Sequence, residues 1–206
     1  MKPIVFETLV EKNMKSKIIG ISGNMGAGKT TLAEALALGL QATMIGWDEF
    51  DDISSGPDDL VDWYKRGQNH NEWNYQALAD VLESLKSDQS ILHPTRKCVL
   101  HPKKYIVFDA PLGRLHPQTG QYIDVCIHIE VPLDVSLSRH LIRDFKANDK
   151  TKDELLDELE YYLSHSRPLF FDYALKASAD FIIDGMMATD NQVEVIKKYL
   201  TDVEVS

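Results

Sequence analysis

The chain has 206 residues, of which 44% are hydrophobic and 26% are charged, and this composition suits one α/β domain with a sizeable core. Lys and Arg number 22 against 32 Asp and Glu, which gives a formal net charge of −10. Such an acidic chain repels phosphodiester backbones, so we do not expect a nucleic-acid partner. No basic amphipathic stretch or apolar run of membrane-spanning length occurs, so we expect no membrane partner.

The two cysteines, Cys98 and Cys126, lie far apart in the sequence and fit a reducing compartment. Glu7 and Glu11 interrupt the apolar residues near the N-terminus, so the uninterrupted apolar segment of a signal peptide is missing. We therefore expect a soluble, cytoplasmic protein. Residues 1–16 are expected to form an N-terminal extension, and residues 17–206 a single domain.

Apolar runs and helical periodicities alternate along the chain. Helices are predicted at residues 29–40, 75–86, 134–145, 153–164 and 191–200, and a loop within 56–70. Strands are predicted at residues 17–22, 42–46 and 105–108, within 122–131, and at 181–183. This alternation predicts a mostly parallel sheet that helices cover on both faces.

The segment at residues 23–30 matches the pattern G-x-x-x-x-G-K-[ST] at every fixed position, between a predicted strand and a predicted helix. Glycines let the backbone curl around a polyphosphate, and the helix directs its positive end at the same anion. Lys29 is expected between the β- and γ-phosphates, and Thr30 on Mg²⁺. The residues predicted to bind ATP are Gly23, Asn24, Met25, Gly26, Ala27, Gly28, Lys29, Thr30 and Thr31.

Such a loop occurs in GTPases, in ATP-driven machines and in kinases. The Asn-Lys-x-Asp segment that reads guanine is missing, as is a Leu-Ser-Gly-Gly-Gln-like transporter signature. The chain is also short for a mechanochemical ATPase. A small-molecule kinase is therefore the favoured interpretation.

Two carboxylates are predicted at strand ends, where ligands of open parallel sheets bind. Asp48 follows the second predicted strand, and Asp109 ends the third. We expect Asp48 to orient and deprotonate an acceptor hydroxyl and Asp109 to serve Mg²⁺, with Asp48 also near the metal. The alternatives are a helix cap or solvated loop for Asp48 and a turn residue before Pro111 for Asp109.

The stretch from residue 48 to 62 contains seven acidic residues and no basic one. A solvated acidic face is the simpler interpretation for most of them. If part of the stretch lines the acceptor pocket, it disfavours a phosphorylated acceptor and favours a neutral or cationic one, such as a nucleoside.

Arg139 and Arg143 lie four residues apart on a predicted helix, so they share a face. Arginines on a closing segment stabilise the charge that develops during phosphoryl transfer. Ion pairs with Asp144 or with the acids at 153–160 are the alternative.

Four segments resemble the uridine kinase family, within the phosphoribulokinase, uridine kinase and nucleoside kinase group. They are the loop at 23–30, Trp-Asp-Glu-Phe at 47–50, Leu-Ser-Arg-His-Leu-Ile-Arg-Asp at 137–144, and the stretch from Arg167 to Ile183 with Ala-Asp-Phe-Ile-Ile. The resemblance implies a P-loop NTPase fold with three α/β/α layers, a five-stranded mostly parallel sheet and a helical lid at about 139–165. It also implies ATP and Mg²⁺, with Asp48 as base and both arginines in the lid.

The acceptor-reading parts depart from the family pattern. The hairpin at 91–96 is shorter, and His-Asn-Glu-Trp-Asn-Tyr at 70–75 replaces the usual His-Pro-Asp-Ala-Phe-Asp. Candidate acceptor-binding residues are Trp73, Tyr75, Arg96 and Arg167, although Trp73 and Tyr75 fit a core role equally well. We expect phosphoryl transfer from ATP to a hydroxyl of a nucleoside or related metabolite. Alternatives are a nicotinamide riboside-like or pantothenate-like acceptor and a non-kinase ATP-hydrolysing regulator, and the oligomeric state stays open.

Overall fold

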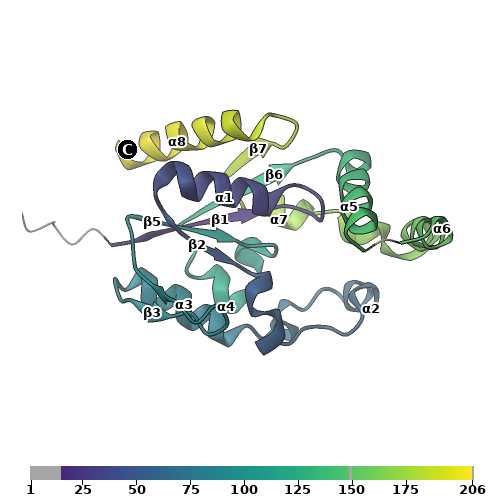
Figure 1. The fold of residues 1–206 in the computed structure, drawn as a ribbon, viewed down its shortest axis with the longest axis horizontal. Helices are drawn as coiled ribbons and strands as arrows, with labels where there is room; N and C mark the ends of the chain where they lie inside the picture. Colours follow the sequence, from purple (N-terminus) through teal and green to yellow (C-terminus); the bar gives the residue numbers. More distant parts are fainter. Residues whose placement is uncertain (1–14, 149, 206) are drawn as a thin grey trace, which may run out of the picture.

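The computed structural model describes residues 15–148 and 150–205 and has a parallel five-stranded sheet at its centre, in the order β2-β5-β1-β6-β7 (Figure 1). The strands are β1 (Lys17–Ser22), β2 (Thr43–Gly46), β5 (Tyr105–Asp109), β6 (Val125–Glu130) and β7 (Phe181–Asp184). β1 and β5 are apolar almost throughout and nearly fully buried, as expected of strands covered on both faces. Most of the predicted N-terminal extension, residues 1–14, lies outside the described residues.

Helices cover both faces of the sheet and form two separate cores (Figure 1). Helices α1 (Lys29–Leu40) and α8 (Thr189–Val205) pack on one face, where Leu36 and Ile196 are fully buried. Helices α3 (Gln76–Lys86) and α4 (Pro117–Gly120) lie on the other, where Leu78 and Leu82 are fully buried. The predicted three-layer α/β/α arrangement with a five-stranded sheet is confirmed.

Two further helices extend beyond the carboxyl ends of the strands, where α5 (Leu133–Asn148) is followed by α6 (Lys152–Tyr161) (Figure 1). Among their described side chains only Ser136 is buried, so these helices add little to either core. The helix predicted at 153–164 changes at Tyr162 into a π-helical turn, Tyr162–Ser166, followed by the 3₁₀ turn Arg167–Phe170. Helix α7 (Tyr173–Ala177) then leads back toward β7.

The stretch predicted to include a loop, 56–70, also contains helix α2 (Leu60–Lys65). Asp59 caps it, because its Oδ1 accepts from the amides of Val61 and Asp62 at 2.8 and 2.9 Å. Val61 and Trp63 then bury the apolar side of the turn. The short strands β3 (Ile91–Leu92) and β4 (Val99–Leu100) form a separate antiparallel hairpin. No helix within the described residues is long and apolar enough to cross a membrane.

Candidate active site

The loop at 23–30 joins β1 to α1 in a conformation that glycine permits. Gly26 and Gly28 have φ of 78° and 97°, a left-handed region that side chains rarely adopt. A Cβ at Gly26 would also clash with the carbonyl oxygen of Ser136, so the loop lies directly against the start of α5. Because α1 begins at Lys29, the positive end of its dipole faces the loop. The loop is therefore shaped to bind an anion.

Lys29 lies within the curl of the loop, where its Nζ donates to the carbonyl oxygen of Asn24 at 3.0 Å. Burial lowers the pKa of Lys29, while the nearby carboxylates of Asp109 and Asp48 oppose this change. A phosphate bound in the loop would favour the charged ammonium and counteract the effect of burial.

Thr30 and Asp109 meet beside the loop, since Thr30 Oγ1 donates to Asp109 Oδ2 at 2.6 Å. Asp109 is 7% exposed, and its Oδ1 is buried with no hydrogen-bond partner among the described residues. Burial raises the pKa of Asp109, and the hydrogen bond from Thr30 and the charge of Lys29 only partly oppose this. A hydroxyl and an unpaired carboxylate oxygen fit Mg²⁺, which takes few protein ligands and completes its shell with water and phosphate oxygens.

A cavity of about 820 Å³ lies beside the loop at the carboxyl ends of the strands. The loop lines one side of it through Gly23, Asn24, Met25, Gly26, Lys29 and Thr30. Asp48 and Asp109 line the cavity as well, and Arg143 reaches it from α5. One space therefore contains the anion-binding loop, both predicted carboxylates and one of the two predicted arginines.

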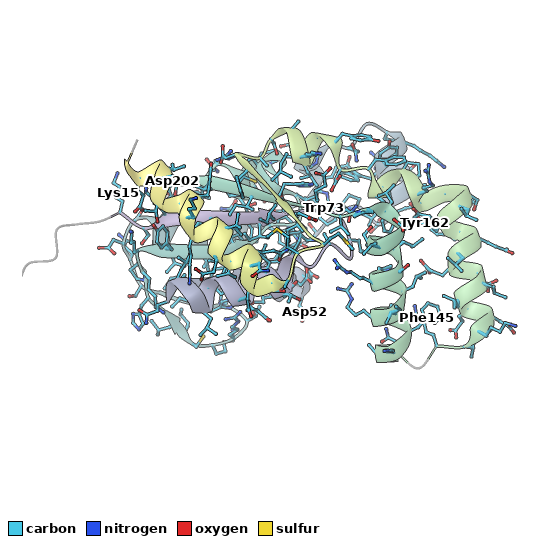
Figure 2. All side chains as sticks on the ribbon, turned by 90° about the horizontal axis from the view of Figure 1, so that it is seen from above. Lys15, Asp52, Trp73, Phe145, Tyr162 and Asp202 are labelled. Atoms are coloured by element: carbon cyan, nitrogen blue, oxygen red, sulfur yellow. The ribbon has the colours of Figure 1, made fainter. Side chains whose placement is uncertain are left out.

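Three rings from helix α2 and from the 3₁₀ turn His70–Glu72 with the residue after it line the cavity elsewhere, and we name Trp63, His70 and Trp73 the aromatic wall. The indole of Trp63 stands perpendicular to that of Trp73, with ring centroids 5.9 Å apart, and to the His70 ring at 5.3 Å. Figure 2 shows Trp73 between the sheet and the helices α5 and α6 in that view. Trp73 Nε1 is buried without a hydrogen-bond partner among the described residues, whereas Trp63 Nε1 donates to Asn69 O at 3.0 Å. The aromatic wall suits stacking against a flat ring.

The structure separates the two predicted arginines. Arg143 lines the cavity, but Arg139 does not, and its guanidinium donates to the carbonyl oxygen of Gly185 at 3.2 and 3.3 Å. Arg139 thus joins α5 to the loop after β7. Within the predicted ATP-binding set, Ala27, Gly28 and Thr31 shape the loop and the start of α1 without lining the cavity.

Three of the four predicted acceptor-binding residues do not line the cavity. The Tyr75 ring lies 4.0 Å from that of Trp47, and its hydroxyl donates to Asp51 at 2.7 Å. Arg96 forms an ion pair with Glu49, and the Arg167 guanidinium lies 4.9 Å above the Phe171 ring. The fourth, Trp73, belongs to the aromatic wall.

Several cavity residues were not predicted from the sequence, among them Trp63, His140 and Asp172. The position of Trp63 could have been predicted, because the cap residue Asp59 and the apolar Leu60, Val61 and Trp63 after it are typical of a short helix. Asp172 lies 3.1 Å from Nε2 of the buried His128, which faces Ser22 Oγ at 3.3 Å. This contact connects the segment after the π-helical turn to the end of β1, and residue spacing alone does not reveal it.

No family model matches the chain. It is 26% identical to a uridine kinase of Clostridium perfringens over 90% of this chain and 97% of that protein. A uridine kinase of Halobacterium salinarum is 29% identical over 80% of this chain and 78% of its own length. A solved sugar kinase from Janibacter shares the fold with a TM-score of 0.51 and 14% identity, covering 90% of this chain and 95% of its own. The similarity to uridine kinases supports an ATP-dependent small-molecule kinase. The chain thus resembles the uridine kinases in sequence and has the P-loop NTPase fold.

Proposed function

We propose that the protein transfers the γ-phosphoryl group of ATP to a hydroxyl of a small acceptor that carries no phosphate. The observation that supports this most is the shared cavity, in which the loop at 23–30 faces the same space as Asp48 and the aromatic wall. A kinase needs ATP and its acceptor in one site, so that the hydroxyl can approach the terminal phosphate in line.

On the phosphate side, the loop amides and Lys29 would hold the β- and γ-phosphates, and Arg143 would stabilise charge on the transferred group. Thr30 and Asp109 would hold Mg²⁺, which neutralises phosphate charge when bound. The buried, unpaired Oδ1 of Asp109 supports this assignment, because a cation would give that oxygen a partner.

On the acceptor side, Asp48 is the proposed base. Its carboxylate lines the cavity at the start of the 3₁₀ turn Asp48–Ile53, which we call η1. It would accept a hydrogen bond from the acceptor hydroxyl, orient the oxygen toward the γ-phosphorus and take the proton as the new P–O bond forms.

The charges around the cavity support an acceptor without phosphate. Among the described residues that line it, the only Lys and Arg are Lys29 and Arg143, both assigned to ATP. Six carboxylates line the same space: Asp48, Asp58, Asp59, Asp109, Glu158 and Asp172. A phosphorylated acceptor would meet like charge with no remaining permanent cation to pair with. A nucleoside would fit this environment, and so would a nicotinamide riboside-like or pantothenate-like compound.

The test is a screen of ADP release with ATP, Mg²⁺ and a panel of acceptors that includes uridine, cytidine, nicotinamide riboside and pantothenate. Stimulation by an unphosphorylated acceptor, with none by the matching monophosphate, is the expected result. Asp48→Asn should retain ATP binding and lose about 10²-fold or more in turnover. The control is Asp52→Asn, an exposed acid of the same turn that does not line the cavity. ADP release that no acceptor stimulates would instead favour an ATP-hydrolysing regulator.

A further inference from the structure

Glu49, the residue after the proposed base, points away from the cavity that Asp48 lines. Its Oε1 accepts from the backbone amide of Gly46 at 3.2 Å and from the Arg96 guanidinium. Its Oε2 faces Nε2 of His93 at 2.9 Å. Glu49 thus folds back onto the end of β2 and contacts the hairpin formed by β3 and β4.

The His93 side chain is fully buried, and its surroundings define its tautomer. Its Nδ1 faces the backbone amides of Thr95 and Arg96 at 3.3 and 3.2 Å, so Nδ1 accepts and carries no proton. Nε2 therefore carries the proton and donates it to Glu49. Burial lowers the pKa of His93 further than the nearby Glu49 carboxylate raises it, which favours the neutral ring. In this tautomer the Nε2–H of His93 donates to Glu49 Oε2, so the direction of the hydrogen bond is fixed.

The same imidazole packs against the next residue of η1, with ring centroids of Phe50 and His93 4.8 Å apart. Phe50 is fully buried. The hairpin therefore contacts both residues that follow Asp48 in the chain, one by a hydrogen bond and one by packing. The Arg96–Glu49 pair is more exposed, with 41% and 23% of the two side chains accessible, and contributes less to fixing the geometry.

None of the hairpin residues lines the cavity, so in this structure the hairpin does not reach the acceptor space. We propose that it acts indirectly, through His93 and Glu49, as a brace that positions Asp48. His93 and Glu49 are then positioning residues, and Arg96 supports them instead of binding the acceptor. The proposal rests on the function proposed above, because it concerns how Asp48, the base of that function, is held in position.

The decisive measurement is a double-mutant cycle between Glu49→Ala and Asp48→Asn. In the wild-type background Glu49→Ala should lower kcat by about 10- to 100-fold, the scale expected when a reacting group moves by about 1 Å, with little change in the KM for ATP. In the Asp48→Asn background it should have almost no further effect, because the group it positions is gone. Asp52→Ala on the same turn is the matched control and should lower kcat in neither background.

Two conservative variants distinguish a loss of positioning from a loss of folding. His93→Gln keeps a side-chain N–H for Glu49 and should recover most of the kcat that His93→Ala loses. Glu49→Gln keeps the size of the side chain and should lose less kcat than Glu49→Ala. Thermal midpoints and ATP binding should stay near wild type for both conservative variants.

If Glu49→Ala lowers kcat by the same factor in both backgrounds, the brace is overturned, because the effect would then not depend on Asp48. The same holds if His93→Gln is as inactive as His93→Ala while folded and binding ATP. Normal turnover of Asp48→Asn alone would instead overturn the assigned base, so failure of the brace and failure of the proposed function are distinguishable.

Discussion

The loop side of the cavity comes from residues 23–30, whose shape is set by the backbone, whereas the aromatic wall comes from side chains of helix α2 and of the 3₁₀ turn that follows it. The loop holds its shape through backbone geometry at Gly26 and Gly28 and through the start of α1. The wall depends on how Trp63, His70 and Trp73 pack against one another. A substitution in the loop should therefore affect any reaction of ATP, while one in the wall should affect the choice of acceptor.

The largest effect is expected from Lys29→Ala on the loop side. It removes the ammonium that lies beside Asp48 and Asp109, so turnover should fall by about 10³-fold whatever acceptor is used. Single-turnover rates with two different acceptors measure this, and Lys65→Ala, an exposed lysine on α2, is the control. A loss of turnover with only one of the two acceptors would contradict the assignment of ATP to the loop side and of the acceptor to the aromatic wall.

A smaller loss of activity, with a gain in stability, is expected from Asp109→Asn. Turnover should fall by about 10- to 100-fold, as is usual when a group that serves a metal is lost. The amide can still accept the hydrogen bond from Thr30, but it carries no buried charge. Because burial raises the pKa of Asp109, this group favours folding at low pH and loses that contribution as the pH rises through the raised pKa. At neutral pH the nucleotide-free variant should therefore melt higher.

A gain of about 1 kcal/mol would raise the melting temperature by about 2–4 °C in a chain of this size. Melting curves without nucleotide at pH 7 and at lower pH measure it, and the difference between variant and wild type should shrink as the pH falls. A variant that melts lower at pH 7 would show that the carboxylate stabilises the fold and would argue against an oxygen kept free for a metal.

The same division explains which parts of the site were predictable. The loop motif needs residues at fixed positions in one segment, so residues 23–30 and the strand and helix around them were found from the sequence. The five-stranded sheet was also found, because buried parallel strands are continuous apolar runs. Arg96 and Tyr75 are typical ligand-binding residue types, yet one pairs with Glu49 and the other with Asp51. Those partners lie 47 and 24 residues away, and only packing determines which side chain reaches the cavity.

The smallest effect is expected from a pair of substitutions two residues apart. Trp73 lines the cavity, whereas Tyr75 is buried beside Trp47. Trp73→Leu should raise the KM for the acceptor about tenfold, which corresponds to the loss of about 1.4 kcal/mol of ring stacking, and leave the KM for ATP unchanged. Tyr75→Phe removes only the hydrogen bond to Asp51, so it should lower stability by about 1 kcal/mol without changing either KM.

Steady-state kinetics and melting curves on both variants separate the two roles. If Tyr75→Phe changes the KM for the acceptor and Trp73→Leu does not, the acceptor binds behind Trp47. The aromatic wall would then not contribute to acceptor binding. If Trp73→Leu raises the KM for ATP as well, the cavity behaves as one binding unit. The contrast between a loop that holds ATP through its backbone shape and a wall that selects the acceptor through side-chain packing would then be wrong, because both substrates would depend on the same packing.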